Sequence, residues 1–160
     1  NTPLYKDGKI FFCHGYNING VMLQLSDDLK SVSVVWRTDV LDTHHGGYVE
    51  VNGTIYGSNW INNNQGNWCA IDWNTGAKGY ETTWTGGKGK GSIIAADGML
   101  YCYDERRGAV ALVNPDPTKF DIVSEFRITK GVGPHWAHPV IVNGVLYIRH
   151  GFALMAYKMK

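Results

Sequence analysis

The chain has 160 residues, of which 15 are Lys or Arg and 14 are Asp or Glu, so its formal net charge is +1. This near-neutral balance gives no electrostatic reason to expect nucleic acid or an anionic membrane surface as a partner, and no apolar run is long enough for a membrane-spanning helix. With 20 glycines and 12% aromatic residues, the composition suits a sheet protein with many tight turns.

Short runs of β-branched and aromatic residues, bounded by Gly, Asn and Asp, follow one another along the whole chain. They fall into four units, and no segment shows a sustained helical period. We expect strands at residues 2–5, 10–11, 21–25 and 32–36, then 48–51, 55–56, 68–72 and 80–84, then 93–96, 100–101, 109–113 and 121–126, and finally 139–142, 146–147 and 153–157.

The first two strands of each unit are joined by the same kind of turn. Asn-Gly and Asp-Gly tolerate positive φ, so they favour the tight turn whose twist matches two antiparallel strands. The turns recur about 45 residues apart, a period typical of propeller blades. They are Asp7-Gly8, Asn52-Gly53, Asp97-Gly98 and Asn143-Gly144.

The sequence therefore predicts an all-β fold, a β-propeller segment of about four four-stranded antiparallel blades at residues 1–41, 42–86, 87–131 and 132–160. The last blade lacks its outer strand, which leaves open, apolar sheet edges that need a partner. We expect the segment to belong to a ring of seven or eight blades. The partner is then either the remaining blades of a longer chain or a second copy of this one.

The connections between strands open on two opposite faces of such a disc. Because the chain alternates direction, the connections from second to third strand and from fourth strand to the next blade share one face, which we call the channel-mouth face. All six histidines fall in these connections or at their strand edges. Loops on a rigid scaffold carry binding residues. We predict a ligand site on this face, built from His44, His45, Asn59, Trp60, Lys88, Arg106, His135, Trp136, His138 and His150.

Three interpretations of these side chains remain open. Imidazole binds Zn, Cu and Ni, so several of the histidines are candidate metal ligands, although their spacing is not a metal signature. The rings of Trp60, Trp136 and Tyr16, with the amides of Asn59 and Asn62, suit stacking on a flat ligand or a sugar. Alternatively, the tryptophans pack between blades and the glycines only shape turns. The candidate metal ligands are His44, His45, His135 and His138.

The three cysteines, Cys13, Cys69 and Cys102, share no spacing motif and cannot all pair within one chain. We expect them to be small buried thiols rather than metal ligands or redox groups.

The end of the second unit resembles the repeat of the pyrroloquinoline-quinone-like (PQQ-like) propellers. The stretch Ala70-Ile71-Asp72-Trp73-Asn74-Thr75-Gly76, followed by Trp84, matches its Ala-x-Asp-x-x-Thr-Gly turn and the Trp that ends the fourth strand. In physical terms, Thr75-Gly76 forms the turn, Asp72 binds backbone donors, and Trp84 packs between blades. The first unit keeps Trp36, whereas the third has Phe126 instead.

The resemblance implies two kinds of function. Quinoprotein dehydrogenases of this superfamily hold PQQ beside calcium, but their adjacent cysteine pair is missing here, and Asp104 and Glu105 are the main acidic residues on the relevant face. A second branch has lost the cofactor and binds proteins. We predict a propeller without cofactor or metal that acts as a ligand- or protein-binding scaffold. The alternatives are a PQQ- and calcium-dependent dehydrogenase fragment or a carbohydrate- or polymer-binding module. The resemblance implies a periplasmic or extracellular location.

Overall fold

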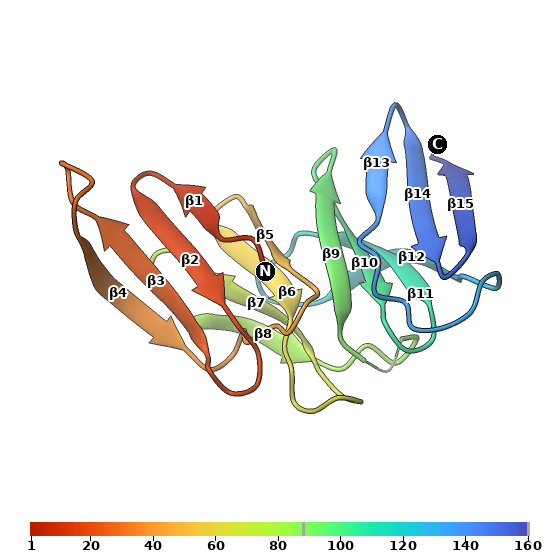
Figure 1. The fold of residues 1–160 in the computed structure, drawn as a ribbon, viewed down its shortest axis with the longest axis horizontal. Coiled ribbons are helices and arrows are strands. Elements are labelled where there is room, and N and C mark those ends of the chain that lie inside the picture. The colour runs from red at the N-terminus through yellow and green to blue at the C-terminus, as the bar shows by residue number, and fades with distance from the viewer. Residues whose placement is uncertain (88, 160) are drawn as a thin grey trace.

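The computed structural model describes residues 1–87 and 89–159, and within them the chain forms four twisted antiparallel sheets that lie side by side (Figure 1). The first sheet contains β1 (Leu4–Lys6), β2 (Lys9–Cys13), β3 (Gly20–Leu25) and β4 (Val32–Thr38). The second contains β5 (Tyr48–Val51), β6 (Thr54–Ser58), β7 (Trp68–Asp72) and β8 (Lys78–Thr82). The third contains β9 (Gly91–Ala96), β10 (Met99–Asp104), β11 (Ala109–Asn114) and β12 (Asp121–Arg127), and the fourth β13 (Val140–Val142), β14 (Val145–His150) and β15 (Ala153–Lys158).

Each sheet is a simple meander in which consecutive strands pair in sequence order. The described residues thus confirm the predicted all-β fold, with three four-stranded blades and a fourth of three strands. The four predicted hairpin turns are also confirmed, because both central residues of each adopt positive φ, the geometry that matches the twist of the flanking strands. Their first residues, Asp7, Asn52, Asp97 and Asn143, have φ of 51°, 51°, 50° and 50°.

The hydrophobic core lies between the sheets rather than within any one of them. One cluster joins the first and second sheets around Phe11, Met22 and Ile55. A second joins the second and third sheets around Trp68 and Leu100, and a third cluster joins the third and fourth sheets. Every sheet therefore depends on its neighbour to bury an apolar face.

An aromatic residue in or just after the outer strand of each of the first three sheets contacts the next sheet. Trp36 lies against Gly76, where a Cβ would come within 2.6 Å of the indole ring. Trp84 is 1% exposed, lies 6.0 Å from Phe120 between ring centroids, and donates from Nε1 to Glu125 at 2.9 Å. In the third sheet this position holds Phe126, which contacts Tyr157 of the fourth sheet.

Several strands begin or end at other residues than the sequence predicted, and three of these differences have a clear physical cause. The strand predicted at 80–84 ends at Thr82, after a register shift between Ala70 and Ile71, since the chain must leave the ladder for Trp84 to enter the next interface. The strands predicted at 2–5 and 139–142 begin after their prolines, because proline has no N–H to donate to the ladder.

Both terminal sheets expose apolar side chains. In the first sheet these are Val32, Val34 and Val35 of β4, and in the fourth sheet they include Val140 of β13 and Leu154 of β15. The fragment is thus only part of a propeller, and further blades are needed to cover these surfaces. No helix in the part of the chain that the structure describes is long and apolar enough to cross a membrane.

Replacing Trp84 with Ala should lower the free energy of unfolding by about 3–5 kcal/mol, because a fully buried indole leaves a cavity between the second and third sheets. Urea denaturation would measure the change. The control is Trp136→Ala, because the Trp136 side chain is 57% exposed. The free energy of unfolding of this variant should stay within about 0.5 kcal/mol of wild type. Equal effects in the two variants would contradict this account of the core.

Candidate functional site

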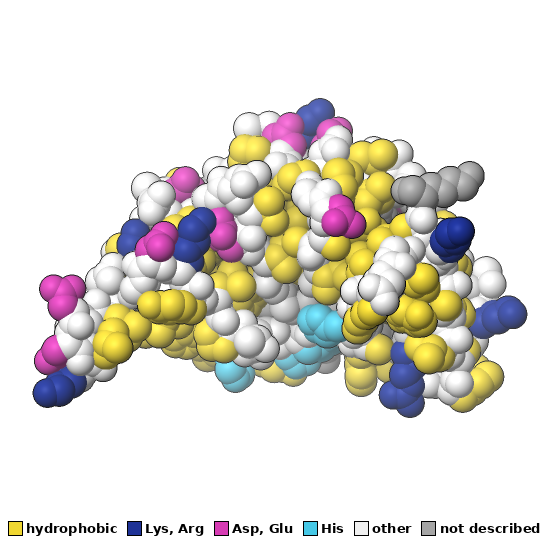
Figure 2. Space-filling model, turned by 90° about the horizontal axis from the view of Figure 1, so that it is seen from above, with side chains coloured by type: hydrophobic (Ala, Val, Ile, Leu, Met, Phe, Trp, Pro, Cys, Tyr) yellow, Lys and Arg dark blue, Asp and Glu magenta, His cyan; other side chains and the backbone are white. Residues whose placement is uncertain are grey.

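A cleft of about 390 Å³ opens on the channel-mouth face. It is lined by side chains from six connections, which involve all four sheets. Each connection joins either the second and third strands of one sheet or the fourth strand to the next sheet, the two kinds predicted to share this face. Figure 2, which shows the molecule of Figure 1 from above, has histidine side chains grouped near the middle of the lower edge. The lining residues are Tyr16, His44, His45, Asn63, Lys90, Glu105, Arg106, Pro134 and Trp136.

The loop that carries His44 and His45 is fixed by close backbone contact with the third sheet. The amide of Ile93 donates to the carbonyl of Gly46 at 3.2 Å, and a Cβ on Gly46 would overlap the carbonyl oxygen of Gly91. Ser58 Oγ donates to that oxygen at 2.9 Å and accepts from the Gly91 amide at 3.0 Å. The two histidines are therefore held at the junction of the second and third sheets.

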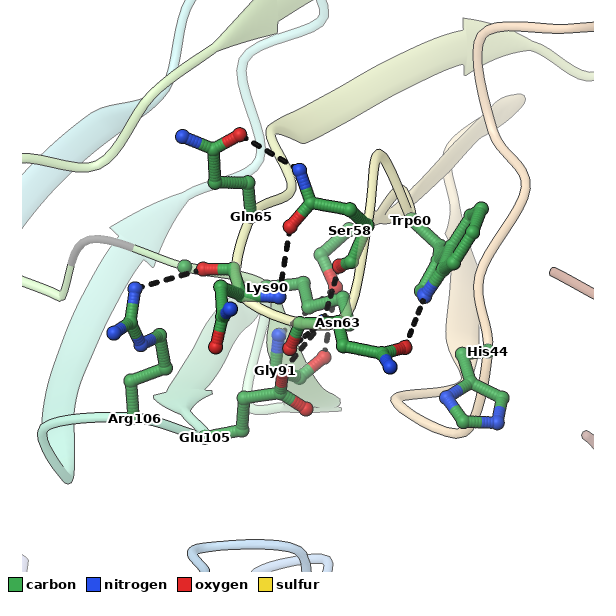
Figure 3. A network of polar contacts seen from close by, with 12 residues as sticks. His44, Ser58, Trp60, Asn63, Gln65, Lys90, Gly91, Glu105 and Arg106 are labelled. Atoms are coloured by element: carbon green, nitrogen blue, oxygen red, sulfur yellow. Dashed lines mark hydrogen bonds and ion pairs between the residues drawn. The ribbon is translucent and has the colours of Figure 1, made fainter. Parts of the chain in front are cut away.

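A buried ion pair forms the floor of the cleft (Figure 3). Lys90 Nζ lies 2.6 Å from Glu105 Oε1, and the two side chains are 4% and 7% exposed. The ammonium also donates to the carbonyls of Asn62 and Asn63 at 3.0 and 3.1 Å. Its three donors are thus all used, and the loop between β6 and β7 is tied to the third sheet. Arg106 Nη1 donates to the next carbonyl of this loop, that of Asn64, at 2.9 Å.

His45 lies beside the second oxygen of the same carboxylate. Its Nε2 is 3.1 Å from Glu105 Oε2, although the two groups are not aligned as a hydrogen bond. Burial raises the pKa of Glu105, but contacts with His45 and Lys90 outweigh burial and hold the pKa below its usual value. A ring nitrogen this close to a carboxylate carries the proton, so in the neutral ring Nδ1 is the acceptor.

Aromatic rings form a continuous row across the cleft. The centroid of Tyr16 lies 4.9 Å from that of Trp60 and 4.4 Å from that of His44, and the Tyr16 hydroxyl is 2.7 Å from His44 Nε2. His44 is followed by His45 at 4.9 Å and then by Trp136 at 5.4 Å. Tyr16 has a φ of 58°, a conformation that is uncommon outside glycine and is found at functional sites.

His135 and His150, which precede β13 and end β14, do not line the cleft. The rings of His135 and His150 stack with centroids 3.7 Å apart, and the Tyr103 hydroxyl is hydrogen-bonded to His135 Nδ1. His150 Nδ1 and Nε2 face the carbonyls of Lys130 and Gly133 at 2.8 and 2.7 Å, so only the doubly protonated ring can donate to both. This cluster fixes the connection between β12 and β13, which carries Trp136 to the cleft.

The structure brings together only part of the predicted site. His44, His45, Arg106 and Trp136 line the cleft, and Trp60 joins it through its contact with Tyr16. The remaining predicted residues have other places. Asn59 is 5% exposed, and its side-chain amide donates to the carbonyl of Val40 and to Glu81. His138 lies in an adjacent pocket, where its Nε2 is 2.9 Å from the carbonyl of His45. His135 and His150 stack on each other outside the cleft, and Lys88 lies outside the described residues.

Lys90, Glu105 and Asn63 were not in the predicted set, and Tyr16 was named only as a candidate stacking ring. All four lie in connections that the blade topology assigns to the channel-mouth face, so loop position was the available signal. Loop position alone does not show which of Lys88 and Lys90 points into the cleft, because each lies between two glycines of the same loop. The direction of a side chain from a glycine-rich turn is set by packing that the sequence does not show.

The described residues do not form a site for the metal ions considered above. His135 stacks on His150 instead of joining His44 and His45, and residues 1–87 and 89–159 contain no group of three or more His, Cys, Asp or Glu side chains able to hold a metal ion. The carboxylate of the cleft, Glu105, is already paired with Lys90. A calcium ion would therefore have to compete with a buried ammonium for that carboxylate.

Solved structures with the same arrangement of sheets define the class of this fold. The chain matches BamB from Moraxella catarrhalis with a TM-score of 0.71 and 16% identity, over 97% of this chain and 41% of that one. A europium-containing methanol dehydrogenase matches with a TM-score of 0.56 and 15% identity, over 77% and 23%. The fold is therefore that of a PQQ-like β-propeller, and the chain spans less than half the length of either protein. No family model and no curated protein matches the sequence.

Replacing Lys90 with Met should lower the free energy of unfolding by about 3–5 kcal/mol, because the Glu105 carboxylate would be left buried without its partner. Replacing both residues with Met should restore most of the loss. The control is Lys78→Met, which removes a more exposed pair with Glu81 at 3.5 Å and should cost less than about 1 kcal/mol. Chemical denaturation of the variants measures these differences. A double variant as unstable as the single one would contradict the prediction.

Acid should destabilise the fold through His135. Burial, assisted by the charge of His150, lowers the pKa of His135 to about 4, whereas the unfolded residue titrates near about 6.5. As the pH falls from about 6.5 to about 4, the unfolded chain gains a proton that the folded chain refuses, so stability is lost across this interval.

The variant His135→Gln should be less stable than wild type at pH 7 but should lose roughly 1–3 kcal/mol less on acidification. Urea midpoints measured between pH 7 and pH 4 test this difference. Groups such as Asp104, whose pKa burial raises to about 6, are common to both proteins and cancel. Parallel pH profiles would show that His135 is not the responsible group.

Proposed function

We propose that this chain is part of a PQQ-like propeller that works without a cofactor, as a scaffold that binds a ligand or a protein through the cleft on its channel-mouth face. The observation that carries the proposal is the way in which the cleft is built. Loops from all four sheets meet there, and the two ionised groups on its floor already neutralise each other. A rigid, aromatic-lined concavity with few oriented polar groups is typical of a binding site.

The chemistry of the floor supports binding rather than catalysis. The Lys90 ammonium is saturated by one carboxylate and two carbonyls, so it has no N–H left to polarise a substrate. Glu105 is held in its ionised form by Lys90 and His45. Groups that the fold has fixed in this way position the loops and the imidazole, and the exposed rings of Tyr16 and Trp136 are left for contact.

We also propose that the ring is completed by further blades of a longer chain or by a second copy, and that the protein works in the periplasm or outside the cell. The first part rests on the exposed apolar faces of the terminal sheets. The second rests on the resemblance of the repeat to the PQQ-like propellers.

A photo-crosslinking residue at position 136 tests the binding function directly. In cells that produce the full-length protein, p-benzoylphenylalanine in place of Trp136 should give a discrete adduct on irradiation, because this side chain is 57% exposed at the cleft. The control places the same residue at Leu29, which is 69% exposed in the connection between β3 and β4 on the opposite face.

An adduct from position 136 that position 29 does not give is the expected result, whether the captured species is a protein or a smaller ligand. Equal labelling from both positions, or no adduct from position 136, would contradict a function at the cleft.

A further inference from the structure

The ionised groups of the cleft argue against a ligand that binds by charge alone. Lys90 and Glu105 form a pair at 2.6 Å, so the floor has no net charge to offer. His44 lines the same cleft, and burial above all lowers its pKa, which disfavours the charged form of its ring. Arg106 at the margin is the remaining ionised side chain among the described lining residues.

The uncharged polar groups offer donors and acceptors close together. Trp60 Nε1 donates to Asn63 Oδ1 at 3.4 Å, which leaves the amide nitrogen of Asn63 as a donor to the cleft (Figure 3). His45 Nε2 lies 3.1 Å from the Glu105 carboxylate, which favours the proton on this nitrogen, so Nδ1 of the neutral ring is an acceptor. The Tyr16 hydroxyl, bound to His44 Nε2, keeps one further hydrogen-bonding position. A ligand that satisfies both kinds of group needs substituents that donate and accept, as hydroxyls do.

The exposed rings supply a flat apolar surface next to these groups. Trp136 and Tyr16 are 57% and 47% exposed at two sides of the cleft, and the rings of His44 and His45 connect them. A surface aromatic residue is commonly used where one side of a ligand is apolar and its rim is polar. A pyranose ring has this shape, with a C–H face and hydroxyls at its edge.

We propose that the cleft binds a pyranose ring of a glycan, stacked on Trp136 and hydrogen-bonded by Asn63 and His45, an inference that rests on the binding function proposed above. Neutral hexoses and uronates share this ring chemistry. Arg106 distinguishes them, since its guanidinium lies at the margin of the cleft, where it can pair with the carboxylate of a uronate.

The test is native affinity electrophoresis of the full-length protein in gels that contain soluble starch, hydroxyethylcellulose or alginate. We expect at least one polysaccharide to retard the protein, and we expect Trp136→Ala and Asn63→Ala to weaken that retardation about tenfold. The matched control is Phe152→Ala, which removes an aromatic side chain that is 81% exposed and does not line the cleft. Arg106→Met should weaken retardation only in alginate.

The outcomes separate the hypotheses. Retardation by starch or hydroxyethylcellulose that Arg106→Met leaves intact identifies a neutral glycan, and retardation by alginate that this variant removes identifies a uronate. No retardation in any gel, or retardation that Trp136→Ala leaves unchanged, overturns the proposal. If the photo-adduct at position 136 still forms in that case, the binding function stands and only the ligand class is wrong.

Discussion

Packing of each sheet against the next is the constraint on which the rest of this structure depends. A single four-stranded meander has two faces and cannot bury either of them by itself. The buried residues accordingly form three layers, each between two neighbouring sheets. The order of the sheets along the chain then decides which loops become neighbours. The aromatic residue in or just after an outer strand, such as Trp84 after β8, packs against the next sheet.

The cleft follows from this packing because its parts come from different sheets. Lys90 precedes β9, Glu105 follows β10, and the carbonyls that Lys90 binds belong to the loop between β6 and β7. The ion pair is therefore a joint between two blades as well as the floor of a cavity. The connection that carries Trp136 is fixed separately, by His150 and the carbonyls of Lys130 and Gly133. Stability and site geometry are controlled here by the same contacts.

The sequence was sufficient for the architecture because the signals were local. An Asn-Gly or Asp-Gly pair such as Asn52-Gly53 determines its own turn, and the alternation of strand direction assigns each loop to a face. The partners of side chains were not predictable in this way. His135 was grouped with His44 and His45 by residue type, but stacking on His150 takes it away from them. His150, on which His135 stacks, lies at the end of β14, and only the folded chain brings the two rings together.

The burial of the three thiols has a practical consequence for work on this protein. None of Cys13, Cys69 and Cys102 is in a disulfide, and burial raises the pKa of Cys13 to about 12 and those of the other two well above the usual value. A thiol that is both covered and protonated does not react with maleimides at neutral pH. A cysteine introduced at an exposed position of the cleft would therefore be the sole labelled site of this chain, so spectroscopic probes can be attached there without first removing Cys13, Cys69 and Cys102.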